Sequence, residues 1–244
     1  MIRNFKPVLA LLVIAGVPAF ADVINLVTDR GSLEGNDQIN WGQLPLSITF
    51  LNGSQSVTSD HGLGATVTTS TGAFFTDQQG NPWQGNFATG DFAQGDFLIG
   101  TGQFDSTPAT PIDITFSSGV SAVGAQMGYN VITSSPYPFV EGIHVYDSSN
   151  DLLATFTVPG FMDDLGNNSA VFIGVQDLSG ANIARVEFFT TTQAGQCPGS
   201  FAINQLSLVD SLDPVATPEP KSLTLFGTAA LGVLAIVKKR RSQA

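Results

Sequence analysis

Short apolar runs alternate with turn-forming residues along most of the chain, and their spacing predicts strands. Ile112, Ile114 and Phe116 occupy every second position, which is the period of a strand with one buried and one wet face. Eleven runs occur, at 23–27, 46–51, 65–69, 97–99, 112–116, 120–127, 143–146, 152–158, 170–175, 183–189 and 201–209. Because no segment between them has a convincing helical period, we expect an all-β fold, an antiparallel β-sandwich of jelly-roll type.

Polar segments between the runs predict turns, loops and a linker. The sequence Asp-Ser-Ser-Asn-Asp at 147–151 joins two strand-like runs and predicts a hairpin loop. The region 53–113 is expected to hold long polar loops, and 158–169 another. Residues 210–217 are polar and contain a proline, which is typical of a linker.

The N-terminus predicts a processing signal rather than a part of the fold. Residues 1–21 carry the basic residues Arg3 and Lys6 near the start, continue with an apolar run at 7–17 and end in the small residues Ala19 and Ala21. This is the layout of a secretory signal peptide with an Ala-x-Ala cleavage site. The mature chain is therefore expected to begin at Asp22.

The C-terminus predicts a single transmembrane helix. The motif Pro218, Glu219 and Pro220 precedes an uncharged apolar run at 222–237, and the basic cluster Lys238, Lys239, Arg240 and Arg241 follows it. As a helix the run would rise about 24 Å, against a bilayer core of about 30 Å, and the flanking basic side chains can snorkel to supply the difference. Clustered cations stay in the cytoplasm, so the body of the protein is expected outside.

This order of motif, apolar helix and basic cluster resembles the PEP-CTERM sorting signal of Gram-negative bacteria, which is also described as the C-terminal domain of ice-binding proteins. The resemblance covers residues 218–244 alone. It implies that an exosortase, a membrane-embedded cysteine peptidase, recognises and cleaves the tail. The protein would then be anchored transiently in the inner membrane before it reaches the cell surface or matrix, where such proteins accompany exopolysaccharide and biofilm. A plain single-span anchor is the alternative.

The region between the two ends is strongly acidic. Residues 22–217 hold nineteen acidic residues against two basic ones, Arg30 and Arg185, which is a net charge of −17 in a chain of −11 overall. Phosphate binding needs clustered Lys and Arg, so nucleic acid is excluded as a partner. The carboxylates serve either solubility or cation binding.

Two pairs of loop carboxylates are candidates for a structural Ca²⁺, an ion that prefers oxygen ligands from flexible loops. Asp91 and Asp96 lie in a glycine-rich segment, and Asp163 and Asp164 lie in the later loop. Neither pair has the spacing of an EF-hand, and no other cofactor is expected.

No catalytic constellation stands out. Glu141 and His144 would face opposite sides of a strand, so they do not form a ligand pair, and His61 is the other histidine. The single cysteine, Cys197, has no His or Lys nearby in sequence to lower its pKa. We therefore expect a protein that is not an enzyme, with a secreted hydrolase acting on polysaccharide through loop carboxylates as the alternative.

Aromatic residues in or beside loops are candidates for stacking on sugar rings. They are Trp41, Trp83, Tyr129 and Tyr137, and Trp83 is the first choice. The alternative for a tryptophan is that it plugs a loop onto the core.

The expected organisation is a signal peptide at 1–21, an extracellular β-sandwich at 22–209, a linker at 210–217 and a sorting segment at 218–244. The expected function is that of an exported surface or matrix protein, handled by the secretion machinery and an exosortase, that binds exopolysaccharide.

Overall fold

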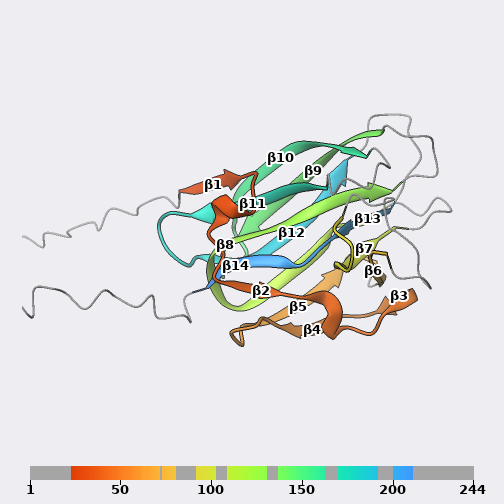
Figure 1. The fold of residues 1–244 in the computed structure, drawn as a ribbon. Helices are drawn as coiled ribbons and strands as arrows, with labels where there is room; N and C mark the ends of the chain where they lie inside the picture. The colour runs from red at the N-terminus through yellow and green to blue at the C-terminus, as the bar shows by residue number, and fades with distance from the viewer. Residues whose placement is uncertain are drawn as a thin grey trace, which may run out of the picture.

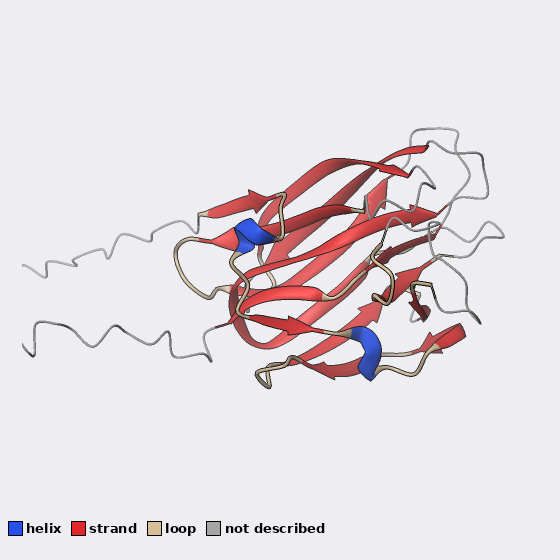
Figure 2. Cartoon of the chain, in the orientation of Figure 1, coloured by secondary structure: helices blue, strands red, loops and turns tan. Residues whose placement is uncertain are grey.

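The computed structural model describes residues 23–71, 73–80, 92–102, 109–130, 137–162, 170–191 and 200–210, and no side chain is described at 47–50, 130, 137 or 161–162. Strands dominate this part of the chain, and its helical structure is limited to two 3-10 turns (Figure 1, Figure 2). The elements are β1 (Ile24–Val27), η1 (Gly31–Leu33), β2 (Asp37–Ile39), η2 (Trp41–Gln43), β3 (Ser47–Asn52), β4 (Gln55–Thr58), β5 (Gly64–Thr69), β6 (Ala73–Gln78), β7 (Phe97–Thr101), β8 (Ile112–Asn130), β9 (Tyr137–Tyr146), β10 (Leu152–Met162), β11 (Val171–Asp177), β12 (Ile183–Thr191), β13 (Ser200–Ile203) and β14 (Leu206–Asp210). The predicted all-β class is confirmed.

The expected signal peptide at 1–21 and sorting segment at 218–244 lie outside the described residues. Within the described part of the chain, no helix has the length and apolar character that a membrane span requires.

The long strand β8 organises the antiparallel β-sandwich. Its first half pairs with β5 and β12, so that Ile114 lies opposite Val186. Its second half pairs with β11 on one side and with β13 and β14 on the other, so that Val123 lies opposite Leu208. Beyond β12 come β9 and β10, and beyond β13 come β7, β6 and β3. β1 and β2 pair with β11 and β14, which places the start of the domain beside its end.

β8 changes its partners close to Gly119. The pairing with β12 jumps there from Thr115 to Val120. A Cβ atom on Gly119 would lie 2.0 Å from the carbonyl oxygen of Ala181, so the close approach of the two backbones requires glycine.

Apolar side chains fill the interior between the layers. In the first half of β8, Ile112, Ile114 and Phe116 are buried while Asp113 and Thr115 face outward, as the alternation predicted. The largest wholly buried side chains include Trp41, Phe74, Tyr129, Phe188 and Phe201. A smaller cluster, made of Val27, Leu33, Ala122 and Phe172, lies on the other side of the second half of β8.

The strand boundaries differ from the predicted ones in several respects. β9 begins earlier, at Tyr137, and β10 extends to Met162, into the region 158–169 where a loop was expected. The runs at 112–116 and 120–127 form one strand, because the Ser-Ser-Gly between them continues the extended backbone instead of turning. The run at 201–209 is two strands, which are separated at Asn204. β2, β4 and β6 lie where no strand was predicted, the last two within 53–113, where polar loops were expected.

The hairpin predicted at 147–151 is confirmed. It joins β9 to β10, which pair as antiparallel neighbours. The Asp147 carboxylate accepts hydrogen bonds from the backbone N–H groups of Ser149 (2.9 Å) and Asp151 (2.8 Å), and Asn150 takes the left-handed conformation at φ 66°. Short polar residues stabilise such turns by these local bonds.

Candidate functional site

One outer face of the sheet carries aromatic and charged side chains on β8, β9 and β12. Because side chains alternate along a strand, these residues point away from the core-facing residues between them. The set, called here the aromatic face, is Asp113, His144, Tyr146, Arg185, Glu187 and Phe189. Cross-strand pairing brings it together, since Glu187 lies opposite both Asp113 and His144, and Arg185 lies opposite Tyr146.

The aromatic part of this face is organised around a glycine. The Phe189 ring stacks on the His144 ring, with centroids 4.3 Å apart and planes 19° from parallel. It also crosses Gly142, where a Cβ atom would lie 2.1 Å from the ring, so that only glycine leaves room for it. His144 Nδ1 is hydrogen-bonded to the Thr155 hydroxyl at 2.8 Å. The rings are thereby held in one arrangement.

The charged part of the face surrounds Tyr146. The Arg185 guanidinium lies 3.6 Å from the centre of the Tyr146 ring and forms an ion pair with Asp113. The Tyr146 hydroxyl donates a hydrogen bond to Glu187 at 3.0 Å. Burial raises the pKa of Asp113, and the hydrogen bond and charge of Arg185 only partly offset this rise. The pKa of Tyr146 is also raised, by burial and by its bond to Glu187.

This arrangement combines what a carbohydrate ligand needs. Rings offer flat apolar contact to the CH faces of sugars, while carboxylate and guanidinium groups can bond hydroxyls. The exposed hydroxyls of Thr155 and Thr157 lie on the adjoining strand β10, opposite His144 and Gly142. The described face therefore presents polar and aromatic groups side by side.

Half of the sugar-binding and calcium candidates predicted from sequence lie outside the described residues. These are Trp83, Asp91, Asp163 and Asp164. Tyr137 begins β9, and its side chain is not among those described. The sorting residues Pro218 to Pro220 and the signal residues Ala19 and Ala21 are likewise outside.

Three candidates that are described have structural positions. Trp41 is 1% exposed, and its indole N–H donates to the backbone oxygen of Asn204 at 2.8 Å, so it plugs η2 onto the core and cannot be a surface platform. Tyr129 is equally buried and packs 5.6 Å from Phe139. Asp96 accepts a hydrogen bond from Asn204 at 2.9 Å.

Asn204 is the centre of a buried polar network at the break between β13 and β14. Its Nδ2 donates to Asp96 and, at 2.8 Å, to the Gln126 side chain. Its Oδ1 accepts from the Gln126 backbone N–H at 2.9 Å and from Arg30 at 2.8 Å. The Asn204 side-chain amide thus replaces the backbone hydrogen bonds between strands that are missing where β13 ends and β14 has not yet begun.

The aromatic face was missed in the sequence, although one signal for it was present. Gly142, His144 and Tyr146 alternate with Ile143 and Val145, and this alternation correctly places His144 on the outer side. Which residues of β12 and β8 lie beside them depends on strand order, which a single sequence does not reveal.

No family model matches the sequence, and no curated protein matches it. Similar solved structures include a DUF4465 family protein from Bacteroides caccae ATCC 43185, with 14% identity and a TM-score of 0.39 over 76% of this chain and 99% of that one. The CBM22-1 xylan-binding domain of Paenibacillus barcinonensis Xyn10C has 11% identity and a TM-score of 0.32, over 59% and 86% of the two chains. A glycoside hydrolase family 43 arabinoxylan arabinofuranohydrolase from Bacillus subtilis, solved with cellotetraose, has 11% identity and a TM-score of 0.30, over 59% of this chain and 27% of that one. At these values the similarity is a loose one of β-sheet architecture, and it indicates neither a ligand nor an activity.

Proposed function

We propose that the protein is a non-enzymatic, exported surface or matrix protein whose β-sandwich binds a neutral polysaccharide through the aromatic face. The signal peptide at 1–21 and the tail at 218–244 support export and sorting by the secretion machinery and an exosortase, with the inner membrane as a transient anchor. A jelly-roll connection of the strands is part of the same proposal. Cell surface or extracellular matrix is the proposed destination.

The observation that carries the binding proposal is the stacked Phe189–His144 pair beside Tyr146, with ionic groups around it. An exposed sheet side needs only polar residues for solubility, so aromatic rings held there by Gly142 and Thr155 call for another explanation. The body's charge selects the kind of polymer. With two basic residues against nineteen acidic ones, it repels anionic chains and favours neutral ones.

The binding test uses affinity electrophoresis of the full-length chain in gels that contain a neutral polysaccharide, with an acidic polysaccharide as the comparison. We expect retardation by at least one of a set of neutral polymers and none by acidic ones. Tyr146→Ala and Phe189→Ala should each weaken binding by about tenfold, which corresponds to about 1.4 kcal/mol. Leu178→Ala, at a residue 60% exposed outside the face, is the matched control and should leave binding unchanged.

Thermal unfolding of each variant shows whether the fold is retained. Retention of full binding by both folded aromatic variants would contradict the proposed face. Absence of retardation by every neutral polymer would contradict polysaccharide binding as the function.

The sorting part of the proposal has a separate test. Deletion of residues 218–244 should move the protein from the envelope fraction into the periplasm or the medium of its host, because the apolar helix and basic cluster that hold it are removed. Unchanged fractionation would contradict the role of the tail.

A further inference from the structure

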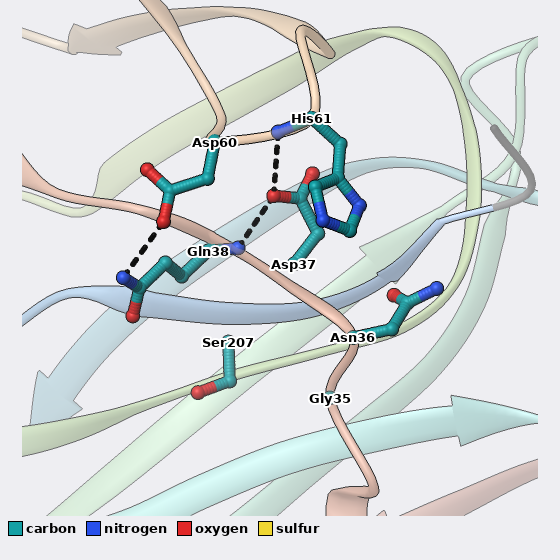
Figure 3. A pocket seen from close by; sticks show the side chains of 7 residues that line it. All are labelled: Gly35, Asn36, Asp37, Gln38, Asp60, His61 and Ser207. Atoms are coloured by element: carbon teal, nitrogen blue, oxygen red, sulfur yellow. Dashed lines mark hydrogen bonds between the residues drawn. The ribbon is translucent and has the colours of Figure 1, made fainter. Parts of the chain in front are cut away.

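A second polar site lies where β2, the turn between β4 and β5, and β14 meet (Figure 3). Asp37 begins β2, Asp210 ends β14, and His61 belongs to the turn. A ligand atom from each of these three residues lies within 4.8 Å of the others. The neighbouring cavity measures about 260 Å³ and is lined by Gly35, Asn36, Asp37, Gln38, Asp60, His61 and Ser207.

Hydrogen bonds hold one oxygen of Asp37 and leave the other for a ligand. Oδ1 accepts from the backbone N–H groups of Gln38 (2.8 Å) and His61 (3.0 Å), and Figure 3 shows both bonds. Oδ2 is buried and has no hydrogen-bond partner among the described residues. The residue as a whole is 6% exposed. A buried carboxylate oxygen without a donor is costly, so this atom calls for a cation or another ligand.

The turn that carries His61 is fixed against β2. The backbone N–H of Asp60 donates to the Gln38 oxygen at 3.0 Å, and the Gln38 side chain donates to the Asp60 carboxylate at 2.9 Å. The His61 side chain is exposed at the rim of the cavity. The backbone of the turn is therefore fixed in position beside Asp37.

The cluster places two carboxyl groups close together and away from water. Asp37 and Asp210 are 6% and 5% exposed, and carboxylates at such sites are stabilised by positive charge between them. Neither arginine of residues 22–217 supplies it, because Arg30 bonds Asn204 and Arg185 pairs with Asp113. A divalent cation held by the two carboxylates would supply it.

We propose that Asp37, His61 and Asp210 bind a Zn²⁺ ion, with water in the remaining position toward the cavity. Imidazole and carboxylate together suit zinc, whereas Ca²⁺ and Mg²⁺ take oxygen ligands alone. Zinc ligands at about 2.0 Å in tetrahedral geometry lie about 3.3 Å apart. The ligand atoms here lie within 4.8 Å of one another, so the side chains need to close by at most about 1.5 Å. None of the three residues was among the metal ligands predicted from sequence.

The proposed ion joins the beginning of the domain to its end. β2 and β14 are neighbours, and Asn36 already links them, since its N–H donates to the Leu208 oxygen at 2.9 Å and its side chain accepts from the Asp210 N–H at 3.1 Å. A metal bound only by the folded state adds to its stability. Zinc would therefore hold the last strand in place where the chain leaves the domain.

The test is titration calorimetry and thermal unfolding of the full-length chain after treatment with a chelator. We expect one Zn²⁺ per chain, a higher melting temperature with Zn²⁺, and no comparable effect of Ca²⁺ or Mg²⁺. His61→Ala and Asp37→Asn should weaken Zn²⁺ binding at least about 100-fold. His144→Ala, at the other histidine, is the matched control and should keep Zn²⁺ binding within a few-fold.

His61→Ala keeps the test decisive if Asp37→Asn fails to fold, because the His61 side chain is exposed. Equal Zn²⁺ binding by wild type and His61→Ala would place any zinc elsewhere and overturn the proposal. No Zn²⁺ binding by the wild type would overturn the proposal and leave the cluster as a structural contact between a histidine and two carboxyl groups. Ca²⁺ binding stronger than Zn²⁺ binding would overturn the choice of metal.

Discussion

Replacement of Asn204 by alanine is expected to be among the most destabilising single changes in the sandwich. The side chain is 1% exposed and makes four hydrogen bonds, two with Gln126 and one each with Asp96 and Arg30. Alanine removes all four without filling the space. The N–H of Gln126 then loses its acceptor, because the pairing with β13 and β14 on that edge of β8 is interrupted between Met127 and Gly124.

The magnitude follows from the kinds of bonds that are lost. The two bonds with Gln126 are neutral and contribute about 1 kcal/mol each, and the two with ionised groups about 1.5 to 3 kcal/mol each. The full sum overstates the loss, since Arg30 keeps its bonds to Gln205 and Ser207 and water can reach the half-buried Asp96. We expect a decrease of about 3 to 4 kcal/mol in the free energy of unfolding, a large part of a typical total of about 5 to 15 kcal/mol.

Equilibrium denaturation in urea, monitored by tryptophan fluorescence, measures this change because Trp41 bonds the Asn204 carbonyl. The matched control is Asn25→Ala, at an exposed position of β1, which should change stability by less than about 0.5 kcal/mol. A loss below about 1 kcal/mol for Asn204→Ala, with an unchanged dependence on urea, would refute the reasoning, since it would mean that water satisfies the network.

Three further predictions concern backbone packing and pH. Gly119→Ala should lower the melting temperature by several degrees, because the new Cβ meets the Ala181 carbonyl at 2.0 Å, whereas alanine at the open position Gly53 should cost less. Burial would raise the pKa of Asp177, but hydrogen bonds from neighbouring side chains and N–H groups lower it below the ordinary value. The stabilisation by the ionised Asp177 carboxylate is thus present above about pH 4 and lost in acid. Asp177→Asn should therefore lower the free energy of unfolding by about 1 to 2 kcal/mol at pH 7 and leave it unchanged at low pH. Urea denaturation at a series of pH values measures this difference. Burial raises the pKa of Asp77, so the ionised form of this carboxyl opposes folding. Asp77→Asn should therefore stabilise the protein at pH 7 and lose this effect in acid. A variant that is less stable than the wild type at pH 7 would contradict this prediction.

Strand content was predictable where one face of a strand is apolar and the other polar. The alternation of Ile112, Ile114 and Phe116 is a local signal, and it placed the first half of β8 correctly. The continuation of β8 through its Ser-Ser-Gly was not predictable, because turn formers also occur at bends inside strands. β2 was missed because three residues, Asp37 to Ile39, are too few to show a period.

The two sites were hidden for a different reason. The aromatic face joins β9 to β12, and the metal cluster joins Asp37 to Asp210 across the whole domain. Such contacts are set by strand order, which depends on packing between distant segments. Trp41 illustrates the same limit, since its position beside a loop left open whether it is a sugar platform or a plug onto the core. It is buried, with its indole N–H bonded to the Asn204 carbonyl between β13 and β14.

The partners of β8 also determine when the domain can fold. Of the strands that pair with it, only β5 precedes it, whereas β11, β12, β13 and β14 all lie between Val171 and Asp210. A chain synthesised from its N-terminus therefore carries β8 without most of its partner strands until residue 210 has emerged. Folding governed by such distant pairings is slow and occurs late. Late folding suits the proposed export, which would pass an unfolded polypeptide through a narrow translocation channel.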